Sequence, residues 1–165
     1  MVQIREFVES DFEQVQSIYL QGIKTGNATF EKKVKSWPEW DEAMLKECRL
    51  VAERNGNLVG WAALSSVSNR AVYAGVAEVS IYISSSAKRM GVGTSLLLEL
   101  IDQSEVAGLW SLQAGIFPEN EASLHIHKKC GFSVLGTRDR LGKMNGIWRN
   151  VTLLERRSQV EGIEV

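Results

Sequence analysis

The sequence predicts an α+β domain with a mixed, largely antiparallel central sheet and helices on both of its faces. Strand-like and helix-like segments follow one another without strict β-α-β alternation, which argues against a purely parallel sheet. Asn55 and Gly56 stand between two apolar runs, a pattern typical of a β-hairpin. With 165 residues, 44% of them hydrophobic and 24% charged, the chain is long enough to bury the core of one domain.

Three elements are expected before the hairpin. The alternating residues 2–7 (VQIREF) predict a first strand. Residues 10–11 (Ser-Asp) offer an N-cap to a helix whose apolar residues recur at helical spacing and which ends near Gly22. Ser36 and Pro38 then mark the start of a second helix.

The rest of the chain is expected to mix strands and helices after a loop at residues 65–75. Asn120 can cap a helix, and Gly131 suits the left-handed position that ends one. We expect strands at residues 50–54, 58–64, 76–83, 110–117, 132–136 and 149–154, and helices at residues 94–107 and 121–130.

Composition restricts the classes of partner. A formal net charge of −1 gives no general attraction to nucleic acid or to an anionic membrane, so we expect a small-molecule partner. No apolar run reaches membrane-spanning length and the N-terminus lacks a signal-peptide pattern, which favours a cytoplasmic protein. Cys48 and Cys130 fit no CxxC spacing, and His125 and His127 point to nearly opposite sides of a helix. We therefore expect neither a disulfide framework nor a bound metal.

Lys88 to Gly93 (KRMGVG) lie between a strand-like run and a leucine-rich helix. Glycines leave backbone amides unshielded and the first turn of a helix adds partial positive charge, so the segment is a candidate cradle for a pyrophosphate. A plain strand-to-helix turn is the alternative. A dinucleotide-binding fingerprint would need a third glycine near Leu96, and a P-loop would need a GK[ST] ending. NAD and ATP are both disfavoured.

This segment resembles the Q/R-x-x-G-x-G/A element of the Gcn5-related N-acetyltransferase (GNAT) superfamily, with Lys88 where the family has Arg or Gln. A second element, Asn120 and Ser123 followed by Gly131 and Phe132, is similar to the family's N-x-x-S helix that ends in G-F. Four segments resemble the phosphinothricin and methionine sulfoximine acetyltransferase branch: TGNATFE at residues 25–31, GWAAL at 60–64, AEVSIYI at 77–83 and WRNV at 148–151.

The resemblance implies a single N-acetyltransferase domain of the GNAT fold over residues 1–157, with residues 158–165 as a C-terminal tail. It implies that acetyl-CoA donates its acetyl group to the α-amino group of a small amino-acid analogue, by direct attack in a ternary complex. Phosphinothricin, methionine sulfoximine and methionine sulfone are the expected types. It also implies a homodimer, in which the loop from Gly142 to Trp148, carrying Asn145, reaches the neighbouring subunit's site.

Two alternative functions stay open beside this one. The chain could acetylate protein N-termini or polyamines, although no peptide groove or acidic pocket can be identified in the sequence. It could also be a non-catalytic acyl-CoA-binding module, which would keep the cradle and need no catalytic carboxylate.

The same resemblance assigns residues to acetyl-CoA. Backbone groups of the strand at residues 76–83 should pair with the pantetheine amides, the cradle should hold the pyrophosphate, and the capped helix should line the pantetheine arm. The residues expected at the cosubstrate are Ile81, Tyr82, Ile83, Lys88, Arg89, Met90, Gly91, Val92, Gly93, Thr94, Asn120 and Ser123.

Two side chains are candidates for proton transfer. On an extended segment Glu78 shares one side with Ser80 and Tyr82, away from the apolar residues between them, and we expect it to pass the amine's proton through water. A solvated charge on an exposed sheet face is the alternative. His127 lies four residues before Gly131, where many acetyltransferases have a tyrosine that acts as general acid, and its alternative role is helix packing.

The acceptor's α-carboxylate calls for a cation, and an arginine fork holds a carboxylate better than a lysine does. Arg70 is the candidate, in a segment with Tyr73 that is similar to the family's R-x-x-Y stretch, although a surface arginine is equally compatible with the pattern. Thr29 and Phe30 are expected on the opposite wall. Trp37, Trp40 and Trp61 shape either a pocket or, as the commoner outcome for such spacing, the core.

Overall fold

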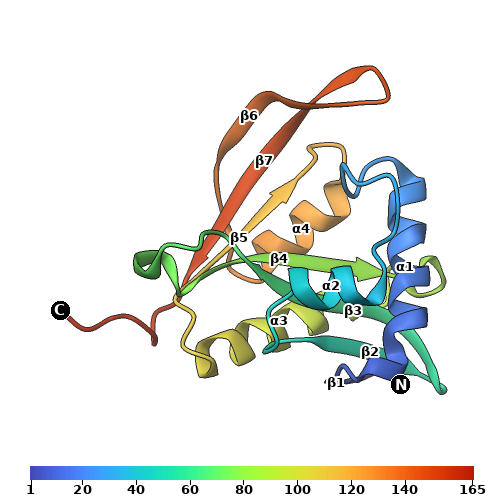
Figure 1. Cartoon of the computed structure of the whole chain (residues 1–165), viewed down its shortest axis with the longest axis horizontal. Helices are drawn as coiled ribbons and strands as arrows, with labels where there is room; N and C mark the ends of the chain where they lie inside the picture. Colours follow the sequence, from blue (N-terminus) through green and yellow to red (C-terminus); the bar gives the residue numbers. More distant parts are fainter.

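The computed structural model describes residues 1–165. Its strands are β1 Gln3–Glu6, β2 Leu50–Arg54, β3 Asn57–Ser66, β4 Val76–Ile83, β5 Ser111–Ile116, β6 Ser133–Met144 and β7 Ile147–Arg157. Its helices are α1 Phe12–Thr25, α2 Trp37–Ala43, α3 Val92–Val106 and α4 Glu121–Lys129. The strands form one seven-stranded sheet in the order β1-β2-β3-β4-β5-β7-β6 (Figure 1). Neighbouring strands are antiparallel except β4 and β5, which are parallel.

Each face of the sheet carries its own hydrophobic cluster. The larger cluster, of 20 buried residues, joins the sheet to α3 and to α4, and Leu64, Leu97 and Leu154 are fully buried within it. The smaller cluster, of 8 buried residues, joins the opposite face to α1 and α2 through Val15 and Trp40. The predicted fold class is therefore confirmed: a mixed, largely antiparallel sheet with helices on both faces. No helix has the length and apolar character that crossing a membrane requires.

The parallel pair at the centre of the sheet separates along its length. β4 pairs with β5 only from Val76 to Glu78, opposite Ser111 to Gln113. Beyond Glu78, β4 continues to Ile83 and β5 continues to Ile116, but the two strands no longer pair with each other. Figure 1 shows them diverging. Since β3 pairs with the other edge of β4 along its whole length, the edge of β4 that faces β5 keeps unpaired backbone groups in the gap.

Two predicted element boundaries near glycines are wrong. The first helix does not stop at Gly22 but runs to Thr25, and Gly26 ends it with a left-handed φ of 73°. Gly22 is needed inside the helix because a Cβ there would lie 2.7 Å from the Tyr82 ring. α3 begins at Val92, two residues earlier than expected, so Gly93 lies in its first turn.

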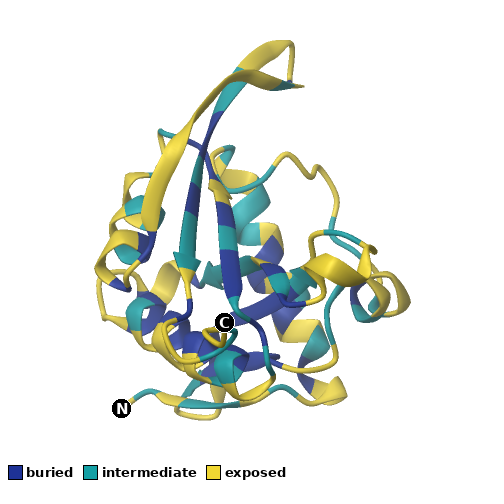
Figure 2. Cartoon of the chain, turned by 90° about the vertical axis from the view of Figure 1, so that its left-hand side faces the viewer, coloured by how far each residue is buried: buried dark blue, intermediate teal, exposed yellow.

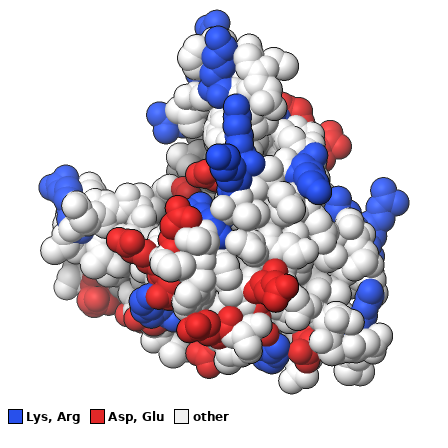
Figure 3. Space-filling view, turned by 45° about the vertical axis from the view of Figure 1, so that its right-hand side comes forward, with Lys and Arg blue, Asp and Glu red and all other residues white.

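The last two strands are much longer than the predicted segments 132–136 and 149–154. Residues 142–148, expected as a loop, are strand ends joined by a two-residue turn at Asn145 and Gly146, whose φ angles are 51° and 78°. Nearly all of β6 is exposed, and the β6–β7 hairpin projects from the body of the molecule (Figure 2). Acidic and basic side chains are both spread over the body on the face in Figure 3, while the hairpin at the top of that view shows basic ones.

Candidate active site

Two cavities meet where β4 and β5 diverge. The first, which we call the inner cavity, has a volume of about 470 Å³ and is lined by residues of α1, β4, β5 and the α1–α2 loop. The second, the cradle cavity, has a volume of about 790 Å³ and extends along the segment between β4 and α3. Six residues line both cavities: Ala28, Ile81, Tyr82, Asn120, Ser123 and His127. The two cavities therefore adjoin at the gap in the sheet.

The cradle cavity is built on the start of α3. Gly91 is the N-cap of this helix and has a left-handed φ of 76°, and Arg89 also has a positive φ, of 64°. This bend turns the chain into the helix, whose first N–H groups have no intrahelical partner. Gly93 packs against α4, because a Cβ there would lie 2.7 Å from Ile126 Cδ1. Of the predicted cradle residues, these line the cavity: Lys88, Arg89, Gly91, Val92, Gly93 and Thr94.

Met90 is the predicted cradle residue that does not line the cavity. Its side chain is half-exposed, and its sulfur accepts a hydrogen bond from Arg54 at 2.7 Å. This side chain therefore faces away from the cradle cavity.

The two expected walls of the pantetheine arm lie on either side of the gap. Ile81 and Tyr82 line both cavities and Ile83 lines the cradle cavity, all three from the part of β4 that is not paired with β5. On the far side, Asn120 caps α4 by accepting a hydrogen bond from the Ser123 amide at 3.2 Å. Unpaired strand groups thus face a capped helix across the space between β4 and β5.

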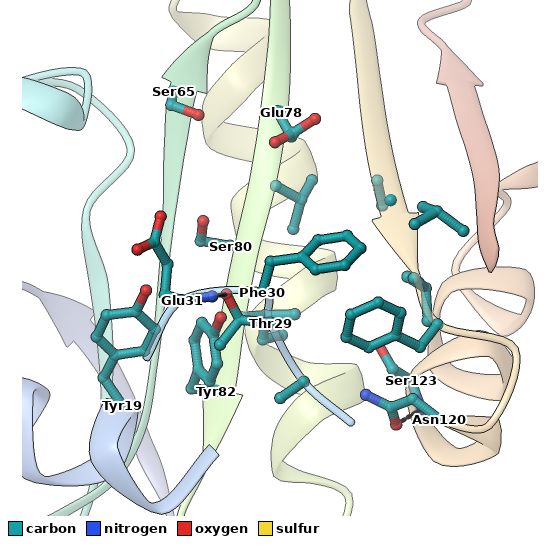
Figure 4. Close-up of a pocket in the computed structure, with 18 of the residues that line it drawn as sticks. Tyr19, Thr29, Phe30, Glu31, Ser65, Glu78, Ser80, Tyr82, Asn120 and Ser123 are labelled. Atoms are coloured by element: carbon teal, nitrogen blue, oxygen red, sulfur yellow. Dashed lines mark hydrogen bonds between the residues drawn. The ribbon is translucent and has the colours of Figure 1, made fainter. Parts of the chain in front are cut away.

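Glu78 stands at the point where the strands separate. Its carboxylate lines the inner cavity and accepts a hydrogen bond from Gln113 Nε2 at 3.0 Å. Ser80 and Tyr82 lie along the same face of β4 (Figure 4), as the alternation predicts. The intervening Val79 and Ile81 pack against the larger core cluster, as does Ile83. Glu78 therefore lines the inner cavity and is at the same time exposed to solvent, so its position fits both the catalytic role and the alternative of a solvated charge.

His127 lies at the junction of the cavities but is only 2% exposed. Its Nδ1 is 2.8 Å from the carbonyl oxygen of Ser123, so Nδ1 carries the hydrogen and donates it. Nε2 has no hydrogen-bond partner, and the Phe132 ring packs edge-on at 5.0 Å. Burial lowers the pKa of His127, which favours the neutral imidazole. The geometry gives no support to a general acid, because Nε2 holds no proton to donate.

Of the residues predicted to bind the acceptor, some line the inner cavity and others lie outside it. Thr29 and Phe30 line the inner cavity (Figure 4). Phe30 packs edge-on against Phe117 at 4.8 Å. Arg70 and Tyr73 do not line it: they lie at the short 3-10 turn before β4, where the Arg70 guanidinium stacks 5.4 Å from the Tyr73 ring. The inner cavity of one chain therefore lacks the predicted carboxylate anchor.

The tryptophans fulfil both of their predicted roles. Trp40 and Trp61 line the inner cavity and also belong to the smaller core cluster, where their rings pack edge-on at 5.7 Å. Trp37 packs against that cluster without lining the cavity.

Several lining residues carried no interpretable signal in the sequence. Tyr19 matched the apolar face of a helix, and Glu31 stood inside the TGNATFE segment without a distinguishing feature. Lys35 follows in a polar stretch that resembles any surface loop. These three side chains meet only because the α1–α2 loop folds back over the sheet. No group of three or more His, Cys, Asp or Glu residues is arranged to hold a metal ion.

Arg149 on β7 holds two of the cavity walls together. Its guanidinium donates to Gly26 O at 2.9 Å and to Asn27 Oδ1 at 2.8 Å, at the start of the α1–α2 loop. It also pairs with Glu119 at 3.3 Å and lies 4.1 Å from the Phe117 ring, in the β5–α4 loop. The WRNV segment was recognised in the sequence, but no local pattern indicated these contacts.

Comparisons with known proteins give a consistent result. A family model described as the acetyltransferase (GNAT) family matches residues 10–132. A phosphinothricin N-acetyltransferase from Alcaligenes faecalis is 34% identical over 164 residues, covering 93% of this chain and 81% of that protein. An L-methionine sulfoximine/L-methionine sulfone acetyltransferase from Salmonella typhimurium is 30% identical over 106 residues, 64% of this chain and 62% of that protein. A solved GNAT superfamily phosphinothricin acetyltransferase from Sinorhizobium meliloti, in complex with AcCoA, is similar with a TM-score of 0.89 and 26% identity, over 99% of this chain and 92% of that one.

Proposed function

Because the chain belongs to the GNAT acetyltransferase family, we propose that it transfers the acetyl group of acetyl-CoA to the α-amino group of a small amino-acid analogue. Phosphinothricin, methionine sulfoximine and methionine sulfone are the acceptor types we favour, since they are named for its relatives. The observation that supports this function most is the divergence of β4 and β5, where the cradle cavity at α3 adjoins the inner cavity that Glu78 lines.

The cradle cavity suits the donor's chemistry. The bend at Gly91 presents the free amides at the start of α3, and Lys88 and Arg89 add two cations to the same cavity. A pyrophosphate needs this combination of N–H donors and positive charge. The unpaired edge of β4 at residues 81–83 has the donors and acceptors that a pantetheine arm requires. When bound, acetyl-CoA would supply an activated acetyl thioester, and binding, orientation and proton transfer fall to the chain.

Glu78 is the group that we assign to deprotonation of the acceptor. An ammonium whose pKa lies about two units above the ambient pH costs about 2.7 kcal/mol to deprotonate, so the carboxylate needs only to receive the proton through water and orient the amine. The hydrogen bond from Gln113 fixes one carboxylate oxygen and leaves the other free. Attack on the thioester then takes place directly, with both substrates bound in the joined cavities.

His127 receives a positioning role in place of the predicted general acid. Its Nδ1–H group joins the side chain to the backbone of Ser123 within α4, and its ring fills the space beneath the helix against Phe132. Since Asn120 caps the same helix, the imidazole helps to hold the wall that faces β4. The leaving thiolate takes its proton from water in this proposal.

We also propose a homodimer formed through the β6–β7 hairpin. β6 is an edge strand with a row of unpaired backbone groups, and the hairpin exposes large apolar side chains. Leu135 is 57% exposed, Ile147 64% and Trp148 55%. Three expectations stay predictions from the sequence: a location in the cytoplasm, one domain over residues 1–157, and a separate C-terminal tail over residues 158–165.

Thiol release from acetyl-CoA tests the proposed reaction. The acceptor panel should contain phosphinothricin, methionine sulfoximine, methionine sulfone, a polyamine and a peptide with a free N-terminus. We expect saturable release with at least one of the three amino-acid analogues and little with the other two classes. Release with the peptide or the polyamine alone would assign the enzyme to a different acceptor class.

A further inference from the structure

The charges of the inner cavity bear on how the proposed acceptor is held, and the inference below rests on the proposed function. Three charged side chains line this cavity: Glu31, Lys35 and Glu78. An α-amino acid brings an ammonium and a carboxylate, and a carboxylate would be repelled by two acidic side chains unless a cation stood beside it. Arg70, the cation expected from the sequence, lies elsewhere, so Lys35 is the only cationic side chain lining the inner cavity.

The ammonium of Lys35 is positioned but not hydrogen-bonded within the protein. Its Nζ lies 4.0 Å from Glu31 Oε1, longer than a hydrogen bond, and 5.6 Å from the centre of the Tyr19 ring. Figure 4 shows Glu31 and Tyr19 side by side at one end of the cavity. The Lys35 side chain is 28% exposed, which keeps it accessible while reducing screening by water.

The backbone of Lys35 is fixed although its tip has free donors. Gln16 on α1 donates from Nε2 to the carbonyl oxygen of Lys35 at 2.9 Å, which ties the residue to the first helix. The ring of Tyr19, from the same helix, then limits where the ammonium can go. A cation held at its base, whose N–H groups make no hydrogen bond within the protein, is suited to binding an incoming anion.

The other cationic side chains near the site either form hydrogen bonds within the protein or line the cradle cavity. The guanidinium of Arg149 is occupied by Gly26, Asn27 and Glu119 and does not line the inner cavity. Lys88 and Arg89 belong to the cradle cavity, where the donor's phosphates are expected.

We propose that Lys35 binds the α-carboxylate of the acceptor and so determines specificity for amino acids over amines that lack a carboxylate. Glu78, the other acidic side chain of the cavity, then faces the ammonium half of the zwitterion and receives its proton. The Glu31–Lys35 distance of 4.0 Å leaves the ammonium free to form hydrogen bonds with the incoming carboxylate.

A matched pair of acceptors tests this assignment: methionine sulfone and its primary amide, which differ in the carboxylate alone. We expect Lys35→Met to lower kcat/KM for methionine sulfone by about 10-fold or more, through KM, and to change kcat/KM for the amide by less than about 2-fold. Lys35→Arg, which keeps the charge, should retain most of the activity on the acid. Lys33→Met is the control, since Lys33 is an exposed lysine of the same loop that lines neither cavity.

Equal losses for the acid and the amide, with the KM for acetyl-CoA unchanged, would overturn the specificity role and leave Lys35 as a structural residue. An unchanged acid-to-amide ratio in an active Lys35→Met protein would do the same. Both outcomes leave the proposed reaction intact. If the unmodified protein acetylates only amines without a carboxylate, the proposed acceptor class fails together with the role of Lys35.

Discussion

Glu78 is the residue on which the proposed chemistry depends most. Replacing Glu78 with Gln keeps the shape and the contact to Gln113 but removes the proton acceptor. We expect kcat to fall about 100-fold or more while the Kd for coenzyme A, measured by calorimetry, stays the same. Glu13→Gln, on the exposed face of α1, is the control. Unchanged turnover in Glu78→Gln would remove Glu78 from the mechanism. An unmodified protein that binds coenzyme A but acetylates no acceptor would be an acyl-CoA-binding module.

His127 makes a prediction about stability and pH. Burial lowers its pKa in the folded protein, so the unfolded chain binds a proton more readily, at a pKa of about 6.5. Its contribution to the free energy of unfolding is therefore fully present above about pH 6.5 and is lost as the pH falls below that value. We expect urea titrations to show that His127→Gln loses part of the decline in stability between about pH 7 and pH 5.

His125 supplies the control for that experiment. It is exposed on the same helix, so the urea titrations of His125→Gln separate the effect of the buried imidazole from that of replacing any histidine of this helix. A decline in His127→Gln as steep as in the unmodified protein would show that the imidazole is not held neutral in the folded state.

At the scale of elements, the start of α3 carries the donor site. Gly91 has a φ of 76° with open space around it, so Gly91→Ala meets no clash but forces a side chain into the left-handed region. We expect the free energy of unfolding to fall by about 1 kcal/mol and the Kd for coenzyme A to rise. Gly136→Ala, at a glycine in equally open space and without a positive φ, should change neither quantity. Tight coenzyme A binding by Gly91→Ala would exclude this bend as the pyrophosphate cradle.

Elements with strong local signals were predicted well. The residue pair Asn55–Gly56 predicts the hairpin correctly, and its φ angles are 52° and 80°. The cap at Asn120 and the left-handed Gly131 predict where α4 begins and ends. The predicted end of α1 is wrong because a glycine at position 22 is required by the close approach of the Tyr82 ring, which is distant in sequence, and not by a local bend of the chain. The length of β6 was underestimated because a strand with almost every residue exposed has no alternation of apolar and polar residues.

The residues of the candidate site also differ in how far the sequence predicts them. The cradle and Glu78 could be identified because their chemistry lies in contiguous segments. Lys35, Tyr19 and Arg149 could not, because they reach the cavities through the folding of separate elements. Arg70 is predicted from its charge and from the R-x-x-Y resemblance of its segment, and the structure places it outside the inner cavity of its own chain.

At the scale of the whole molecule, the projecting hairpin is the feature that a monomer does not explain. A hairpin that exposes Ile147 and Trp148 beyond the body is suited to a second copy of the chain. We expect light scattering after size-exclusion chromatography to give the mass of a dimer, and Ile147→Asp to shift it toward a monomer with reduced turnover. Val106→Asp, at an exposed apolar residue at the end of α3, is the control. A monomeric unmodified protein with full activity would show that the hairpin is not a dimer interface.

The reaction itself is tested most directly by identifying the acetylated product. The unmodified protein should be incubated with acetyl-CoA and methionine sulfoximine, which offers an α-amino nitrogen and a sulfoximine nitrogen, and the product analysed by mass spectrometry and NMR. We expect one acetyl group on the α-amino nitrogen, formed at a rate that saturates with both substrates. An acetyl group on the sulfoximine nitrogen, or coenzyme A binding without any acetylated amino acid among the three analogues, would contradict the proposed function.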